Sequence, residues 1–131
     1  MTTVQIDLSI TASELCLRAA ELIKERGMCT TTLKDHEDKV CLLGAFSEIL
    51  TGEADWRGHF PTYELMNLVP SVMQVADSLS PQWLANYHAE GWEQLPWSER
   101  IYKWSDFIVD FYGTEAVIEE LLKLAHTLEA T

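Results

Sequence analysis

Apolar and polar residues alternate at the start of the chain, where four apolar side chains occupy every second position: Val4, Ile6, Leu8 and Ile10. A period of two is typical of a short strand with one buried face. The pattern also suits an extended N-terminal arm. We therefore expect either a strand or such an arm ahead of the first helix.

The first helix is predicted from its two ends as well as from its apolar face. Thr11, followed three residues later by Glu14, matches a capping box, and Ile10 stands in the position of a hydrophobic staple. Gly27 is the type of residue that ends a helix in the left-handed conformation. The helix should cover residues 12–26, with an apolar face formed by Leu15, Ala19, Leu22 and Ile23.

The segment after Gly27 has a different character. Its three consecutive threonines favour extended structure, and the polar run 35–38 is typical of a turn. We expect a small β-hairpin between residues 28 and 43. A second helix is predicted over residues 41–50, with an apolar side that includes Leu42, Ala45, Phe46, Ile49 and Leu50.

Prolines and helix-capping residues divide the remaining chain. A helical stretch should begin near Thr62 and break or restart at Pro70, because proline lacks the backbone N–H that a helix interior needs. The pair Ser80-Pro81 is typical of a helix start, and Gly91 of its end.

Two further helices are predicted, one from Ser98 and one from Thr114. Their apolar faces contain Ile101, Trp104 and Ile108 in the first, and Val117, Ile118, Leu121, Leu122, Leu124, Ala125 and Leu128 in the second. Together these patterns predict a mainly α fold: a single-domain bundle of about five helices over residues 1–131, with a small N-terminal β-hairpin or strand.

The charge balance changes the picture of what such a bundle would bind. The 131 residues include 21 acidic and 9 basic side chains, and the net charge is −12. Attraction to nucleic-acid phosphates or to anionic lipid headgroups is therefore disfavoured at long range. We expect partners that are basic, cationic or neutral, with no direct binding of nucleic acid and no membrane association.

The chain lacks the sequence features of secretion and of membrane insertion. No window approaches the roughly 18 uninterrupted apolar residues of a membrane span, and no signal-peptide pattern opens the chain. Cys16, Cys29 and Cys41 are an odd, irregularly spaced set, which suits reduced thiols. We expect a cytoplasmic protein without a structural disulfide.

Three fragments carry a resemblance to a known family. They are Ala19-Ala20-Glu21-Leu22-Ile23 leading into Arg26-Gly27, then Val40-Cys41-Leu42-Leu43-Gly44-Ala45, then Trp104-Ser105-Asp106 upstream of Thr114 and Val117. Read together, they resemble, in the N- and C-terminal parts of the chain only, an uncharacterised family of small proteins from actinobacteria and their phages, classed only as a domain of unknown function. Members usually have asparagine where this chain has Ser105. The resemblance implies a helical domain of this size and a phage or mobile-element origin, and no chemistry.

Cys41 is the candidate nucleophile of the sequence. A thiol at a helix start has its thiolate stabilised by the helix dipole, and a nearby histidine could deprotonate it. The opposing interpretation is a buried, inert cysteine in a tightly packed segment. No nucleotide-binding, zinc-protease or hydrolase motif accompanies it.

A metal site is a further alternative. Cys29, His36 and Cys41, together with His59, are residue types that bind zinc, but their spacing matches no short zinc hook. The acidic run 35–38 lacks the glycine and ligand spacing of a calcium loop. We therefore expect no metal and no cofactor.

The stretch 58–99 contains no lysine or arginine, yet it carries several acidic and aromatic residues. Exposed aromatic side chains anchor protein interfaces, and carboxylates steer the approach of a basic partner. Trp92 and Trp97 flank a predicted connection between helices, so we expect them to be exposed, whereas Trp83 and Trp104 should belong to the core. The predicted partner-binding residues are Glu90, Trp92, Glu93, Trp97 and Glu99.

These observations favour a non-enzymatic acidic interaction protein. Its expected role is to regulate or inhibit a basic host protein that handles nucleic acids, on behalf of a phage or mobile element. The alternatives are a small thiol-dependent enzyme centred on Cys41 and a metal-binding protein that uses Cys29, His36 and Cys41.

Overall fold

The computed structural model describes residues 6–30, 32–55, 61–79 and 91–129. In these residues the chain forms six α-helices and one short 3-10 helix. The elements are α1 (Ala12–Arg26), α2 (Leu42–Thr51), α3 (Thr62–Met66), α4 (Pro70–Ser78), η2 (Trp92–Gln94), α5 (Trp97–Tyr112) and α6 (Thr114–Glu129). The mainly helical class is confirmed, with a helix count close to the predicted five.

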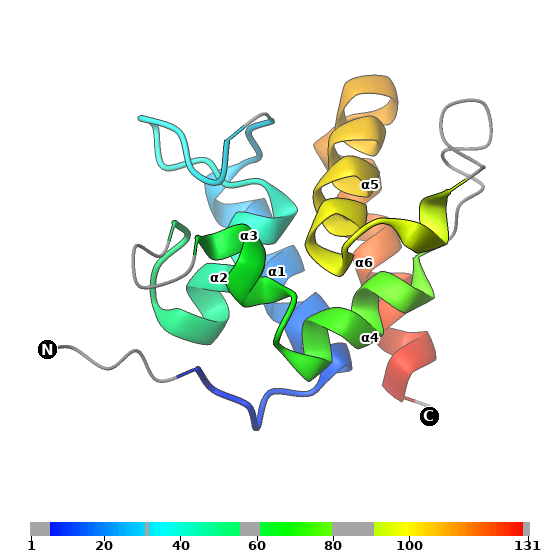
Figure 1. Ribbon diagram of the computed structural model, residues 1–131. Helices are drawn as coiled ribbons and strands as arrows, with labels where there is room; N and C mark the ends of the chain where they lie inside the picture. Colours follow the sequence, from blue (N-terminus) through cyan, green and yellow to red (C-terminus); the bar gives the residue numbers. More distant parts are fainter. Residues whose placement is uncertain (1–5, 31, 56–60, 80–90, 130–131) are drawn as a thin grey trace, which may run out of the picture.

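Helix α1 lies at the centre of the bundle. It packs along α6 and also contacts α2 and α4, while α5 packs against α4, α6, α2 and α3 (Figure 1). The hydroxyl of Ser13 donates to the carbonyl oxygen of Ala125 at 2.7 Å, so the start of α1 lies at the end of α6. The two helices are therefore antiparallel.

The predicted ends of α1 are confirmed. The Thr11 hydroxyl accepts a hydrogen bond from the backbone N–H of Glu14 at 3.1 Å, and Gly27 ends the helix with φ of 84°. The carboxylate of Glu14 pairs with Arg18 at 3.0 Å. Ile10 and Leu15 are both buried, as the hydrophobic staple requires.

The core is made of apolar residues from every α-helix. Its largest fully buried side chains are Trp104, Phe46, Leu15, Ile23, Leu42, Leu43, Leu50, Met66, Ile101, Ile108 and Leu121. The predicted faces of α1, α2 and α5 supply most of them. The stripe predicted for α6 is narrower than expected, because Leu122 is 47% exposed.

The prediction of a β-hairpin between residues 28 and 43 is wrong for the residues that the structure describes. Val40 forms only two isolated bridges there, a parallel one with Met28 and an antiparallel one with Lys34. The backbone N–H of Cys41 donates instead to the carbonyl oxygen of Leu33 at 3.2 Å. The segment therefore folds back onto the start of α2 and does not extend a ladder.

The expected N-terminal strand is likewise absent from residues 6–10. Ile10 is buried, whereas Leu8 is 68% exposed, so the alternating pattern does not correspond to one buried face. The backbone N–H of Asp7 donates to the carbonyl oxygen of Leu50 at 3.0 Å. This contact holds the described part of the N-terminal segment against the end of α2. Val4 lies outside the described residues.

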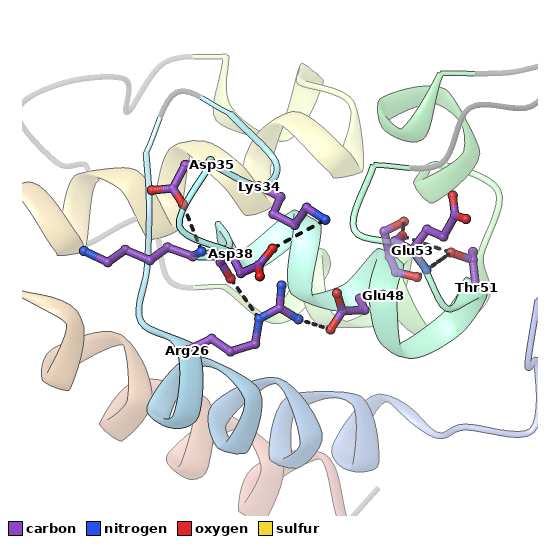
Figure 2. Close-up of polar contacts among 9 residues, drawn as sticks. Arg26, Lys34, Asp35, Asp38, Glu48, Thr51 and Glu53 are labelled. Atoms are coloured by element: carbon purple, nitrogen blue, oxygen red, sulfur yellow. Dashed lines mark hydrogen bonds and ion pairs between the residues drawn. The ribbon is translucent and has the colours of Figure 1, made fainter.

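Polar contacts fix the loop between α1 and α2 (Figure 2). Arg26, at the end of α1, donates from Nε to the carbonyl oxygen of Asp38 at 2.8 Å and also pairs with Glu48 of α2. The carboxylate of Asp35 accepts hydrogen bonds from the backbone N–H groups of Glu37 and Lys39, each at 2.9 Å. The predicted polar turn at 35–38 is thus confirmed.

Pro70 restarts the chain as predicted, since α3 ends at Met66 and α4 begins at Pro70 itself. Proline suits the first turn of a helix, where its missing N–H has no partner to lose. The helix predicted between Ser80 and Gly91 falls mostly outside the described residues. Trp104 is 1% exposed and belongs to the core as predicted, while Trp83 lies outside the described part.

Candidate functional site

A cavity of about 450 Å³ opens between the start of α2, the short helix α3 and the first turns of α5. Its lining combines side chains from four parts of the chain: Thr32, Cys41, Tyr63, Glu64, Asn67, Pro96, Ser98, Glu99, Tyr102 and Asp106. None of these residues is basic. The volume lies within the range, about 300–1,000 Å³, of sites that bind small molecules or side chains.

Helix periodicity explains why α5 supplies much of this lining. Ser98, Tyr102 and Asp106 follow one another at intervals of four residues, and such positions share one face of a helix. The opposite face of α5, which carries Ile101, Trp104 and Ile108, is buried in the core. One helix thus separates a packing face from a polar, cavity-lining face.

Hydrogen bonds and a ring contact hold the walls of the cavity in place. The backbone N–H of Ser98 donates to Oδ1 of Asn67 at 2.8 Å, which ties the start of α5 to the end of α3. The rings of Tyr63 and Tyr102 meet edge to face, with centroids 5.6 Å apart and planes at 79°. Such pairs add about 0.5–1.5 kcal/mol beyond their buried area.

Carboxylates give the cavity a negative character. Glu64 and Glu99 lie at α3 and α5, and Asp106 lies further along α5. The Tyr102 hydroxyl donates to Glu99 Oε1 at 3.3 Å, and Lys103 pairs with Glu99 at 3.6 Å. Burial, followed by the nearby charge of Glu99, raises the pKa of Tyr102, so its hydroxyl stays protonated at neutral pH.

Cys41 lines the cavity from the N-cap position of α2. Its Sγ accepts a hydrogen bond from the backbone N–H of Gly44 at 3.3 Å, and the residue is 3% exposed. Burial raises the pKa of the Cys41 thiol to about 12, which outweighs the lowering effect of the Gly44 hydrogen bond. Asp106 raises it further. A thiolate at neutral pH is therefore disfavoured, and this environment gives the nucleophile hypothesis no support.

The three residues proposed as metal ligands do not form a site. The Cys29 thiol lies within hydrogen-bond distance of two carbonyl oxygens, those of Thr32 at 3.3 Å and Lys39 at 3.2 Å. His36 lies on the exposed turn, with 89% of its side chain accessible. Within the described residues, no group of three or more histidine, cysteine or acidic side chains is arranged to hold a metal ion. His59 lies outside them.

The outcome differs among the predicted partner-binding residues. The expectation that Trp92 is exposed is wrong: it is 4% exposed and belongs to the core. Trp97 is half-buried, and its indole N–H donates to Asp77 Oδ1 at 3.1 Å, which joins α5 to α4. Glu99 lines the cavity. Glu90 lies outside the described residues, and so does the side chain of Glu93.

Trp92 lies in a connection between helices, yet it is buried because removing its large apolar surface from water is favourable. A tryptophan offers a large apolar surface, and the single turn of η2 places it against the core instead of in solvent. The cavity residues that sequence reasoning missed are Tyr63, Glu64, Asn67, Ser98, Tyr102 and Asp106. The polar four-residue spacing within α5 was the one sequence signal that pointed to some of them.

Two of the fragments that carry the family resemblance meet at this cavity. Val40-Cys41-Leu42-Leu43-Gly44-Ala45 contributes Cys41, and Trp104-Ser105-Asp106 contributes Asp106. Ser105, which precedes Asp106, is buried and donates its hydroxyl to the carbonyl oxygen of Tyr102 at 3.2 Å. The fragments thus build both the core and the cavity wall.

Among the described residues, none of the helices combines the length and the apolar character needed to cross a bilayer. No curated protein and no solved structure matches the chain. The sequence pattern of one family matches residues 8–107, which include every residue of the cavity lining. The match covers the middle of the chain, which the resemblance left out, and ends before Thr114 and Val117. The chain therefore belongs to the family of unknown function DUF6197.

Proposed function

We propose that this chain is a non-enzymatic acidic interaction module that binds a basic protein and regulates or inhibits it. The observation that supports the proposal best is the distribution of charge over the described residues. Basic side chains are held in ion pairs within the molecule, and a large set of carboxylates is left facing solvent.

Most of the basic side chains pair with carboxylates of the same molecule. The chain has nine lysine and arginine residues, and seven of them pair with carboxylates: Arg18, Arg26, Lys34, Lys39, Arg100, Lys103 and Lys123. Lys24 forms no ion pair in the part of the chain that the structure describes, and Arg57 lies outside that part. An approaching molecule therefore meets few uncompensated cations.

The acidic side chains, in contrast, outnumber their partners. The following residues are exposed and form no ion pair with described residues: Glu21, Glu25, Glu53, Glu64, Asp110, Glu115, Glu119 and Glu129. Such a surface accelerates encounters with positively charged proteins and repels nucleic acid.

The acidic side chains include two like-charge pairs, and helix stability does not explain the pair near the C-terminus of α1. Glu21 and Glu25 are four residues apart on α1, and Glu115 and Glu119 are four apart on α6. Pairs of this kind destabilise a helix by about 0.2–0.5 kcal/mol each. Because α1 and α6 are antiparallel, both pairs lie at the same end of the bundle.

The proposed partner is a nucleic-acid-handling protein, because proteins of that class present basic surfaces. An acidic module can occupy a surface made for phosphates and so inhibit it. The phage or mobile-element origin suggested by the sequence resemblance, and an actinobacterial host, are parts of the same proposal.

A pull-down with the tagged full chain tests it. The lysate of an actinobacterial host is treated with nuclease and applied at about 50 mM and about 300 mM salt, conditions between which the Debye length falls from roughly 14 Å to roughly 6 Å. We expect a basic protein, retained in stoichiometric amount, whose capture weakens at the higher salt.

A second bait carries four charge-removing substitutions: Glu21→Gln, Glu25→Gln, Glu115→Gln and Glu119→Gln. It should capture the same protein less well at low salt, because the steering charge is reduced. No captured protein at either salt concentration, or an acidic one whose binding ignores salt, would show the proposal to be wrong.

A further inference from the structure

The acidic surface alone does not explain the cavity between α2, α3 and α5. We infer that it binds the cationic side chain of a lysine or arginine of the basic partner, with the apolar stem against the tyrosine rings and the charged end among the carboxylates. This inference rests on the proposed function and assigns that function a specific pocket.

The sign of the charge in the cavity selects a cation. Glu64, Glu99 and Asp106 line it, and none of the described lysine, arginine or histidine residues does. Lys103 offsets part of one carboxylate, since it pairs with Glu99 at 3.6 Å. Anionic ligands such as phosphates would meet repulsion here, because a concave wall strengthens the field of its charges.

The tyrosine rings select an organic cation with an apolar stem. Tyr63 and Tyr102 form one wall, and their edge-to-face contact fixes both rings. The methylene stem of a lysine or arginine can pack against such rings while its charged end stays among the carboxylates. A simple metal ion has no apolar part that could pack against these rings. The described residues also contain no group arranged to hold a metal ion.

The hydroxyl of Ser98 adds a polar group to the lining of the cavity. Ser98 lines the cavity and is 3% exposed, yet its hydroxyl forms no hydrogen bond with any described residue. Its backbone N–H donates to Oδ1 of Asn67 at 2.8 Å, which fixes the backbone of Ser98 at the start of α5. A hydroxyl that lines the cavity and has no partner among the described residues can accept a hydrogen bond from a ligand N–H.

The inference is tested by NMR titration of the full chain with two matched peptides, N-acetyl-Gly-Lys-Gly-amide and the same peptide with an acetylated lysine ammonium. The first should shift the amide resonances of Ser98, Tyr102 and their neighbours, with a dissociation constant on the order of 1 mM for a single side chain. The acetylated peptide should not, because it keeps the stem and loses the charge.

Two charge-matched variants locate the effect. Glu64→Gln should weaken lysine-peptide binding about fivefold, whereas Glu14→Gln, which removes the same charge from the exposed side of α1, should change it less than about twofold. Tyr63→Leu should weaken binding as well and leave the charge untouched. Equal binding of both peptides, or equal losses in the two glutamine variants, would overturn the inference.

Spermidine serves as the free source of the same chemistry. If it binds in the cavity at least about tenfold more tightly than the lysine peptide, and the Glu14→Gln variant shows that its higher charge does not account for the difference, the ligand is a free polyamine and the side-chain assignment is wrong. Comparable or weaker binding supports a protein side chain.

The pull-down separates failure of this inference from failure of the proposed function. A captured basic partner whose binding is unaffected by Glu64→Gln and Tyr63→Leu would remove the cavity from the interface and leave the proposed function standing. Lysine-peptide binding in the cavity, with no protein captured in the pull-down, would leave the cavity assignment standing and count against the proposed function.

Discussion

The Cα atom of Gly44 faces the backbone carbonyl of Leu33 so closely that a Cβ atom at this position would lie 2.1 Å from the carbonyl oxygen. The same oxygen accepts the hydrogen bond from the backbone N–H of Cys41 at 3.2 Å. One carbonyl of the loop thus covers the first turn of α2, and only a residue without a side chain leaves room for it.

Gly44→Ala should therefore destabilise the protein even though alanine is the better helix former. The added methyl group collides with backbone, which cannot move aside as a flexible side chain would. We expect a loss of about 3 kcal/mol in the free energy of unfolding, at the upper end of typical overpacking costs. Urea denaturation followed by circular dichroism measures it.

Gly52→Ala is the matched control for that substitution. Gly52 has φ of 91°, and a Cβ atom added there would meet nothing within 4 Å, so alanine suffers only the strain of the left-handed conformation. That strain costs about 1–2 kcal/mol. If Gly44→Ala is tolerated as well as Gly52→Ala, the loop does not lie on α2 as described.

The Arg26 contacts should matter more than a surface ion pair. Arg26 joins α1 to the loop through Asp38 and to α2 through Glu48, and its side chain is 21% exposed (Figure 2). Arg26→Ala should cost about 1–2 kcal/mol in unfolding free energy, because a charge-assisted hydrogen bond and an ion pair are lost together.

Arg18→Ala is the comparison for Arg26→Ala. Arg18 pairs with Glu14 within α1, and both side chains are about half exposed, at 52% and 49%. Exposed pairs of this type contribute about 0.3–0.5 kcal/mol. Thermal melts of the two variants should differ clearly, and equal shifts would mean that Arg26 contributes no tertiary contact.

The three cysteines should differ in reactivity. Burial raises the pKa values of Cys16 and Cys41 to about 12, while Cys29, raised less, is only half-buried. At a pH of about 8, roughly one thiol in ten thousand would be ionised at a pKa of 12. Iodoacetamide should modify Cys29 first, and Cys16 and Cys41 only after unfolding, as mass spectrometry of peptides can show. Rapid modification of Cys41 in the folded chain would revive the thiol-enzyme alternative.

The buried thiols also predict a loss of stability in alkaline solution. Unfolding returns Cys16 and Cys41 from pKa values of about 12 to the ordinary value of 9.0. Above pH 9 the unfolded chain releases protons that the folded chain retains, so stability falls as the pH rises from 9 towards 12. The loss is about 1.4 kcal/mol per thiol for each pH unit in this window.

Cys16→Ala isolates one of the two thiols. The variant loses some packing at every pH, but its unfolding free energy should fall less between about pH 7.5 and about pH 10 than that of the unaltered chain, by about 1.4 kcal/mol. An unchanged difference between the two pH values would show that Cys16 is not buried as a protonated thiol.

The sequence by itself determined the local structure of the helices. Thr11 and Gly27 mark the two ends of α1 through a side-chain hydrogen bond and a glycine with positive φ, and both signals act within a few residues of the helix. Pro70 could only restart a helix at its first turn, and it does so. The acidic excess could also be predicted, because net charge depends on composition and not on the fold.

Tertiary structure decided the features that depend on residues far apart in the chain. Three threonines favoured extended structure, yet packing of Leu33 against Gly44 replaced a hairpin with a folded-back loop. Trp92 looked exposed from its place in a connection, but the core accepted its large apolar surface. The cavity arises only where Cys41, Tyr63 and Tyr102 meet, since no local pattern records which turns of α2, α3 and α5 will face one another.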